Sequence, residues 1–170
     1  MKRHLLYLKY VLRHKWFCFV GCWRISPILS RTFLLGIIHD WSKFRPSEWS
    51  PCATHFFSDG PDIFDIVKEN FYFAFLHYHV QRNKHHWQHW VAICDSGVHK
   101  CFDMPDCYIM EMVADWYAAG RAISGRRLVT PWYEVNKDKI LLSPMSRIKV
   151  EIAIKGLDHE ETELQNRRAR

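Results

Sequence analysis

The sequence predicts a compact all-α fold, a helical bundle that forms one domain over residues 1–170. Proline, glycine and helix-capping residues divide the chain into segments of helical periodicity, and no segment shows the apolar–polar alternation that is typical of a strand. Hydrophobic residues make up 48% of the chain and aromatic residues 15%, which is sufficient for a packed core. A chain of this length buries about 70% of its unfolded surface in a single domain.

Two helices are expected before the first charged motif. The first spans about residues 2–22, and Ser26-Pro27 marks the loop that follows it. Ser30 is a favourable N-cap residue, so we expect the second helix to begin there. This helix is predicted to end at His39-Asp40.

Two further helices are expected in the middle of the chain. Pro46 is predicted to open a short helix, because proline is favoured in the first helical turn. Asp59-Gly60-Pro61 is predicted to begin a long helix that reaches about Val80. We expect residues 83–94 to continue it after at most a kink, and residues 95–103 to form a loop.

The helices expected in the C-terminal part begin at capping or proline positions. The first is expected to run from Asp103, its N-cap, to Ile123, with Gly125 after its end. The second is expected to begin at Ser143-Pro144. Asp158 is expected to cap the third, a charged helix and tail at about residues 157–170.

The chain is basic, with a formal net charge of +6 and a pI near 9.1, which favours anionic partners such as nucleotide phosphates or nucleic acid. The six cysteines include no C-x-x-C pair, so we expect reduced thiols and a cytoplasmic protein. The uncharged stretch Trp16–Trp23 is too short to cross a bilayer, so we expect no membrane partner.

A His–Asp pair, His39-Asp40, closes an apolar run, and Lys43 follows three residues later. An imidazole beside a carboxylate suits Zn, Mn or Fe, but His-Asp dipeptides are common, so the pair needs further ligands. His14 is one candidate. It lies on a mostly apolar face of the first helix, where a lone histidine is more often a core residue than a ligand.

Residues 77–89 contain five histidines. On a continuous helix His79, Asn83 and His86 would form one stripe. Two imidazoles two turns apart could hold two neighbouring metals, or could meet at one metal if the helix kinks near Asn83. A polar, aromatic-rich surface is the alternative interpretation.

The other histidines of this segment are not assigned a role. His85 and His89 form a second stripe with Arg82, which indicates either support for the ligands or a solvent-exposed face. The role of His77 stays open.

Glu111 and Asp115 fall one helical turn apart on the same face. Two carboxylates at this spacing repel each other unless a cation, a proton or a salt bridge lies between them. Val113 and Ala114 make the surroundings apolar, so an unpaired Asp115 would be costly. A metal ion would stabilise the pair, and so would a base such as Arg121.

The order of these residues resembles the HD superfamily of metal-dependent phosphohydrolases, whose pattern is H…HD…D with additional histidines where two metals bind. The spacing from His39-Asp40 to Lys43 is similar to the HD-x-x-K signature of that superfamily. The resemblance implies an HD-domain-like helical bundle. His79 and His86 lie only seven residues apart, whereas two-metal HD enzymes usually draw these histidines from separated positions, so the number of metals stays open.

A closer resemblance is to an uncharacterised phage and bacterial family of HD-like proteins, which implies the cytoplasm of a bacterial or phage-infected cell. Its motifs are an early His-Lys, then HD-x-SKF-x-P-x-E, N-x-HHW-x-x-W and EM-x-x-DW. They are similar to His14-Lys15, residues 39–48, residues 83–90 and residues 111–116, and the match extends to Trp132-Tyr133 and Lys139-Ile140.

The resemblance implies hydrolysis of a nucleotide or other small phosphate ester by a metal-bound hydroxide. One or two divalent ions (Mn, Fe, Zn, Co or Ni) would be bound. The implied metal ligands are His14, His39, Asp40 and Asp115 for one ion, with His79 and His86 for a second ion or for the substrate. The candidate catalytic residues are Lys43, Glu48 and Glu111, and weaker candidates for binding substrate phosphate are Arg82 and Arg121.

Two alternatives stay open. The order H…HD…H…H…D is also that of HD proteins that hold two irons and activate oxygen, so an HD-type diiron oxygenase is the second hypothesis. The third is a non-catalytic, basic nucleic-acid-binding module, which the net charge and the arginines of residues 167–170 favour. The oligomeric state is not predicted.

Overall fold

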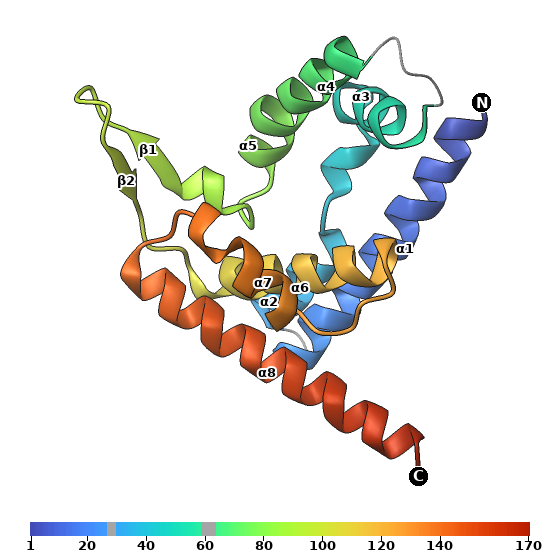
Figure 1. The fold of residues 1–170 in the computed structure, drawn as a ribbon, viewed down its shortest axis with the longest axis vertical. Coiled ribbons are helices and arrows are strands. Elements are labelled where there is room, and N and C mark those ends of the chain that lie inside the picture. The colour runs from blue at the N-terminus through green and yellow to red at the C-terminus, as the bar shows by residue number, and fades with distance from the viewer. Residues whose placement is uncertain (27–29, 59–63) are drawn as a thin grey trace.

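The computed structural model describes residues 1–26, 30–58 and 64–170, and it confirms the all-α fold (Figure 1). Two short antiparallel strands are the exception to the helical structure in this part of the chain. The residues described include no helix that is both long enough and apolar enough to cross a membrane. All six cysteines are free thiols, as predicted.

The elements include three 3₁₀ helices (η1, η3 and η4) and one π-helical segment (η2). In chain order they are α1 (Lys2–Ile25), α2 (Arg31–Ile38), η1 (Trp41–Phe44), α3 (Pro46–Phe57), α4 (Phe64–Phe73), η2 (Ala74–His79), α5 (Val80–Arg82), η3 (Trp87–Trp90), β1 (Val91–Ile93), β2 (His99–Cys101), α6 (Asp106–Ile123), α7 (Thr130–Asn136), η4 (Lys137–Lys139) and α8 (Pro144–Arg168).

Helices α1 and α6 form the centre of the molecule and pack closely against each other. A Cβ atom at Gly21 of α1 would lie 3.0 Å from the Cβ of Ala114 on α6, a tight contact, so glycine favours this close approach. Cys18, Cys22 and Ala118 complete the small-residue contact between the two helices. This close crossing brings His14 and Asp115 to the same side of the interface.

The helix before the His–Asp pair has the predicted boundaries. The Ser30 side chain caps α2 by accepting a hydrogen bond from the backbone N–H of Phe33 at 3.2 Å. The helix ends at Ile38, and Asp40 adopts the left-handed conformation with φ of 53°. Among the residues described, Asp40 is the single non-glycine residue with positive φ.

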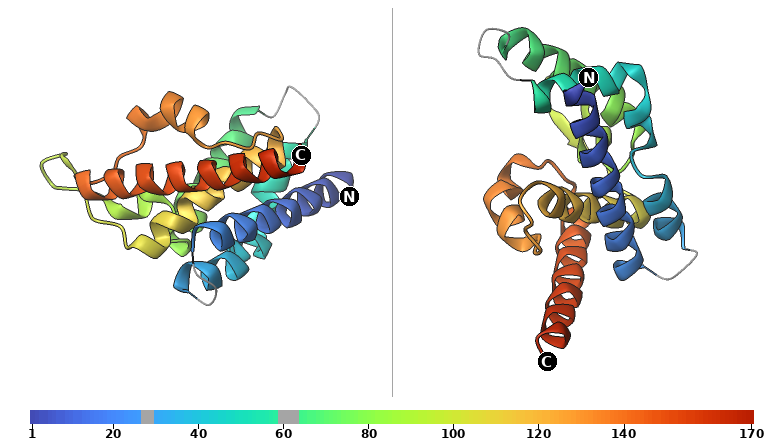
Figure 2. Two further views of the ribbon diagram at one scale, coloured as in Figure 1. Left: turned by 90° about the horizontal axis from the view of Figure 1, so that it is seen from below. Right: turned by 90° about the vertical axis from the view of Figure 1, so that its right-hand side faces the viewer.

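A second group of helices, α3 to α5, lies beside the N-terminal half of α1, which α3 contacts directly (Figure 2). Pro46 opens α3, as predicted. The predicted start of the long helix at Asp59-Gly60-Pro61, and the residues after Ser26 in the first predicted loop, lie outside the described residues. From Phe64 the helical backbone runs through a π-helical segment to Arg82.

The predicted helix over residues 83–94 was wrong, and the predicted loop over residues 95–103 contains a short strand. Helix α5 ends at Arg82, because Asn83 turns to an extended conformation and its side chain donates to the carbonyl of His79 at 2.8 Å. A 3₁₀ turn and a β-hairpin follow, with Val91 opposite Cys101. Strands of three residues are too short to show an alternating pattern, and Gly97 supplies the positive φ of the turn between them.

The largest core cluster lies among α6, α7 and α8, and α7 was not predicted. Ser143 caps α8 by accepting from the N–H of Ser146, as predicted. Asp103, the predicted N-cap of α6, instead accepts a hydrogen bond from the hydroxyl of Ser143. Gly125 follows the end of α6 with φ of 72°, in agreement with its predicted role.

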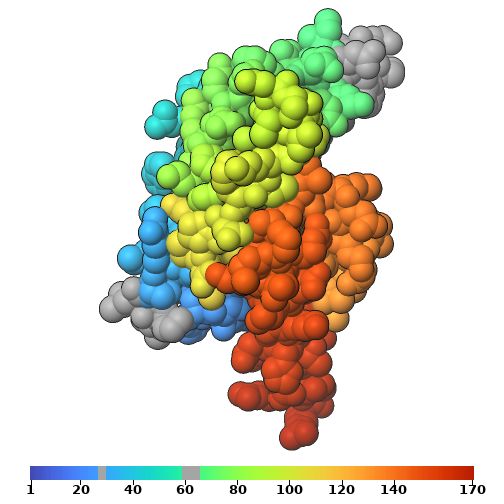
Figure 3. Space-filling model, turned by 90° about the vertical axis from the view of Figure 1, so that its left-hand side faces the viewer, coloured from blue at the N-terminus to red at the C-terminus, as the bar shows by residue number. Residues whose placement is uncertain are grey.

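Asp158 was predicted to cap a separate final helix, and this was wrong. It lies inside α8, and its carboxylate accepts hydrogen bonds from the backbone N–H groups of Val129 and Thr130 at 2.7 and 2.9 Å. Asp158 therefore caps α7 from the side. The C-terminal half of α8 projects from the body of the molecule (Figure 3).

Candidate metal centre

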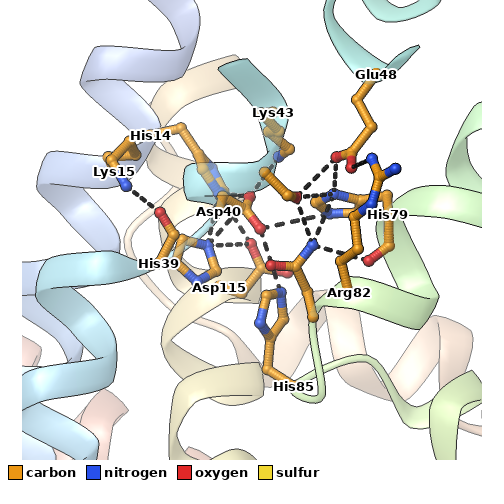
Figure 4. Close-up of polar contacts among 12 residues, drawn as sticks. His14, Lys15, His39, Asp40, Lys43, Glu48, His79, Arg82, His85 and Asp115 are labelled. Atoms are coloured by element: carbon orange, nitrogen blue, oxygen red, sulfur yellow. Dashed lines mark hydrogen bonds and ion pairs between the residues drawn. The ribbon is translucent and has the colours of Figure 1, made fainter. Parts of the chain in front are cut away.

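Histidine and carboxylate side chains from five parts of the chain converge at the crossing of α1 and α6 (Figure 4). Their ligand atoms fall into overlapping groups that could hold a metal ion. The groups are His14, His39, Asp40 and Asp115; Asp40, His79, His85 and His86; and His39, His85 and Glu111.

The first group has the spacing of a metal site. Nε2 of His14 and Nε2 of His39 lie 3.2 Å apart, and both face Oδ2 of Asp40 and Oδ1 of Asp115. The five measured separations among these four atoms range from 3.0 to 3.4 Å. Four donors about 2.0–2.1 Å from a tetrahedral ion are about 3.3–3.4 Å from one another. The four residues therefore fit one divalent ion.

The second group uses the other oxygen of Asp40. Oδ1 of Asp40 lies 3.4 Å from Nε2 of His79 and 3.5 Å from Nε2 of His85. His86 packs against both rings, with ring centres 4.7 Å from His79 and 4.2 Å from His85. The Nε2 atoms of His85 and His86 are buried without a hydrogen-bond partner in the described part of the chain, which is typical of metal ligands rather than of core histidines.

Asp40 is thus the residue common to both groups, with one carboxylate oxygen toward each. The left-handed backbone at the end of α2 directs its side chain into the centre, and Asp tolerates this conformation better than most residues. A non-glycine residue in this conformation costs about 1–2 kcal/mol. The fold accepts this cost at the position where both ligand groups meet.

Two further carboxylates hold the imidazole rings from outside. Oε1 of Glu111 lies 3.0 Å from Nδ1 of His39 and 3.2 Å from Nδ1 of His85. Oε2 of Glu48 lies 2.8 Å from Nδ1 of His79. An ionised carboxylate can only accept, so each Nδ1 carries a proton, and Nε2, which faces Asp40, is the nitrogen that could bind a metal.

The charges of the centre favour an ionised Glu111 and a neutral His86. Burial opposes the ionisation of Glu111, but the hydrogen bonds from His39 and His85 outweigh it and lower the pKa of Glu111 to about 2. Burial, together with the neighbouring His85 and His79, lowers the pKa of His86 well below its usual value and keeps that ring neutral. A neutral imidazole is the form that binds a metal.

The field at the first group favours a positive charge. Burial alone would lower the pKa of His39, but Asp40 and Asp115 outweigh it and raise that pKa well above its usual value. Burial likewise disfavours the ionised form of Asp115, but hydrogen bonds from His14 and His39 hold its pKa well below the usual range. The same negative charges would stabilise a divalent cation placed between these carboxylates.

Lys43 is the cation closest to the centre. Its Nζ lies 2.5 Å from Oδ2 of Asp40, and this carboxylate outweighs burial and raises the pKa of Lys43. Lys15 donates to the backbone carbonyl of His39 from the opposite side. These contacts fix the turn that carries the His–Asp pair.

A cavity of about 320 Å³ opens onto the centre. Its polar lining includes Lys43 and four of the candidate ligands, His14, His79, His86 and Asp115. The remaining walls are mainly aromatic, contributed by Tyr7, Tyr10, Phe56, Phe71, Phe75, Trp87, Trp116 and Trp132. The arrangement places an aromatic-lined cavity beside candidate metal ligands.

The structure brings together all six predicted metal ligands and adds His85. The sequence predicted either support of the ligands or the solvent face for His85, and the solvent-facing alternative was wrong, because the helix does not continue through Asn83. His85 is 1% exposed. The doubled histidine His85-His86, two residues after Asn83, was the signal, since a helix that ends before Asn83 can direct both rings inward.

The predicted phosphate-binding arginines lie elsewhere. Arg82 pairs with Oε1 of Glu48 at 2.6 Å and lies over the ring of Tyr78, behind His79. Arg121 lies over the ring of Phe17. Neither arginine lines the cavity. His77 is exposed against Phe73, and His89 contacts Trp90, so both are outside the ligand groups.

Comparison with known proteins gives one match. Residues 3–156 match the model of a family described as a family of unknown function (DUF5662). No curated protein and no solved structure matches the chain.

Proposed function

The chain belongs to the family of unknown function DUF5662, and we propose that it is a metal-dependent phosphohydrolase that acts on a nucleotide or other small phosphate ester. The observation that carries the proposal is the position of Asp40. Its two carboxylate oxygens face two separate sets of imidazoles at the wall of a cavity. In this proposal Asp40 would offer one carboxylate oxygen to each of two divalent ions.

The proposed first ion is held by His14, His39, Asp40 and Asp115, and the second by Asp40, His79, His85 and His86. Ions bound there supply a hydroxide nucleophile near neutral pH and positive charge for the phosphoryl oxygens. Zn, Mn, Fe, Co and Ni all accept a mixed imidazole and carboxylate set.

The residues of the chain have three tasks in this reaction. Lys43 lines the cavity and donates to a phosphoryl oxygen of the substrate, which stabilises the charge that develops there. Glu111 and Glu48 hold His39, His85 and His79 in position and keep their Nδ1 protons in place. Both glutamates are positioning residues in this scheme.

The substrate class is supported by the walls of the cavity. Trp116 and Trp132 lie with ring centres 5.1 Å apart, so a flat group such as a nucleobase can pack against them. Lys43 is the single lysine or arginine among the described cavity-lining residues. One cation beside the metals favours a phosphate monoester over a triphosphate, which carries more negative charge.

The test combines metal analysis with phosphate release. We expect elemental analysis of the purified protein to find up to two divalent ions per chain, and we expect Mn to support phosphate release from a panel of nucleotides and aryl phosphates. EDTA treatment should abolish release, and added Mn should restore it. Absence of bound metal, or phosphate release that EDTA leaves unchanged, would contradict the proposal.

The same ligand order favours a second candidate function, an HD-type diiron oxygenase. The specific observation is that His85 completes a second histidine-rich group around the shared Asp40. Iron content and turnover under argon separate the candidates. Phosphate release that proceeds equally with and without oxygen supports the hydrolase, whereas product formation that requires both iron and oxygen supports the oxygenase.

A further inference from the structure

Arginines converge at the C-terminal end of α6, outside the metal centre. Nη1 of Arg127 lies 3.1 Å from Oε1 of Glu161, and Nη1 of Arg121 lies 3.5 Å from the same oxygen. Arg24 forms an ion pair with Oε2 of Glu161. Three guanidinium groups, from α1, α6 and the loop after α6, therefore face a single carboxylate of α8. We call these three residues and their two neighbours, Arg13 and Arg126, the arginine cluster.

The arginine cluster has more hydrogen-bond donors than Glu161 can satisfy. Each guanidinium carries five N–H donors, whereas a carboxylate has about four acceptor positions. One of these positions on Glu161 accepts the hydroxyl of Tyr117 at 2.9 Å. Nη1 of Arg121 is buried and makes no hydrogen bond in the described part of the chain, although it lies 3.5 Å from Oε1 of Glu161 as an ion pair. A buried charged donor that makes no hydrogen bond is costly, which favours a ligand with additional oxygens.

Two more arginines increase the local charge. The guanidinium groups of Arg13 and Arg121 lie 5.6 and 4.8 Å from the centre of the Phe17 ring. Arg126 lies against Gly120 in the last turns of α6. The negative end of α6 counts for about half a charge. Even when Asp158, which caps α7 nearby, is counted with Glu161, the positive excess is about two charges or more.

Glu161 differs from the arginines in its position relative to the segment that matches the family. All five arginines lie within the segment that matches the family, residues 3–156, whereas Glu161 follows it. Glu161 is also the last buried residue of α8. The side chain of Arg127 is 43% exposed, so the arginine cluster is open to solvent at this point.

We infer that the arginine cluster is a binding site for a phosphate group, and that the carboxylate of Glu161 occupies part of this site. Arginine binds phosphate through paired N–H···O bonds, and a phosphate group carries nearly two negative charges, which matches the excess. The ligand approaches from the exposed side of Arg127 and provides a hydrogen-bond acceptor for Nη1 of Arg121, which makes only an ion pair with Glu161. This site is independent of the metal centre and of the proposed hydrolysis.

The test measures phosphate binding to the full chain with two probes. Inorganic pyrophosphate, followed by calorimetry, represents a small phosphorylated ligand. A fluorescein-labelled single strand of about twelve nucleotides, followed by anisotropy, represents a nucleic-acid backbone. For the probe that binds, we expect Arg127→Ala to weaken the affinity about tenfold or more. We expect Glu161→Gln to raise the affinity for the same probe, because the substitution removes the carboxylate charge that competes with the ligand.

Lys155→Ala is the matched control, because Lys155 is an exposed cation on α8 and its loss changes the net charge equally. The affinity of the Lys155→Ala variant for the probe should stay within about twofold of the wild-type affinity. Circular dichroism checks the fold of each variant, and the exposed Arg127 keeps the test valid if Glu161→Gln does not fold. Failure of both probes to bind, or equal binding by wild type and Arg127→Ala, would overturn the inference.

Discussion

At the scale of single residues, Asp40 carries most of the function that we propose. It combines a left-handed backbone, complete burial and two carboxylate oxygens that face different histidine sets. Substituting it tests two properties at once, because alanine removes the carboxylate and also fits the left-handed conformation poorly. Asparagine removes the charge but tolerates this backbone.

We expect Asp40→Asn to lose metal and activity while it keeps the helical content and most of the stability of the wild type. Asp40→Ala should show the same losses and a further destabilisation of about 1 kcal/mol, because alanine is strained at positive φ. Elemental analysis, far-UV circular dichroism and urea unfolding measure these effects. Normal metal content and turnover in Asp40→Asn would contradict the assignment of Asp40 as the shared ligand.

At the scale of elements, the π-helical segment and the end of α5 decide which histidines meet. The π-helical segment η2 ends at His79, and irregular helical turns of this kind are frequent at functional sites. Asn83 donates to both the carbonyl of His79 and the hydroxyl of Ser42, at 2.8 and 2.7 Å. It therefore ties the end of the helix to the segment after the His–Asp pair and directs His85 and His86 back toward Asp40.

The outer carboxylates come from different helices, and this makes their roles separable. Glu111 of α6 contacts a histidine of each ligand group, whereas Glu48 of α3 contacts only His79 of the second group. We expect Glu111→Gln to weaken the binding of both ions about 10–100-fold, and Glu48→Gln to weaken only one. Competition with a chromophoric chelator measures both affinities.

The exposed Glu134→Gln is the control for this comparison, because Glu134 contacts Lys137 on the surface. It should bind both ions with the affinity of the wild type. If Glu48→Gln weakened both ions equally, the separation into two groups would be wrong.

At the scale of the whole molecule, Glu161 joins α8 to α1 and α6 through Arg24, Arg121, Arg127 and Tyr117. Burial opposes ionisation of Glu161, but hydrogen bonds from Arg24, Tyr117 and Arg127 outweigh it and lower its pKa. The folded state therefore binds a proton at Glu161 less readily than the unfolded state does. This contribution to stability is complete above the unfolded pKa of about 4.3 and is lost as the pH falls through the lower folded pKa.

We therefore expect Glu161→Gln to lower the free energy of unfolding by about 1.5–3 kcal/mol at pH 7. The difference between wild type and variant should shrink as the pH falls below about 4, because the wild-type carboxylate is then protonated as well. Urea unfolding of both proteins over this range measures the difference, and the exposed Glu134→Gln again serves as the control. A difference that is the same at all pH values would show that the charge of Glu161 is not its source.

The sequence by itself determined the helical class, most helix starts and the six candidate ligands. These depend on local properties: Ser30 and Ser143 cap helices through their own side chains, Pro46 opens a helix through its fixed φ, and His39-Asp40 follows an apolar helix. The parts that were predicted wrongly depend on distant contacts. Asp158 caps α7 across a gap of 28 residues or more, and residues 83–94 leave the helix where Asn83 contacts Ser42.

Only the tertiary structure decided how the ligands are shared. It turned His85 inward, gave the two oxygens of Asp40 to different groups, and removed Arg82 and Arg121 from the cavity. The physical reason is that periodicity determines which face of a helix a residue occupies, whereas the partner of that face depends on helix crossings and chain reversals. In this chain the helix crossing is the close approach of α1 and α6 at Gly21, and the chain reversal is the turn at Asn83. These two features determine which ligands meet.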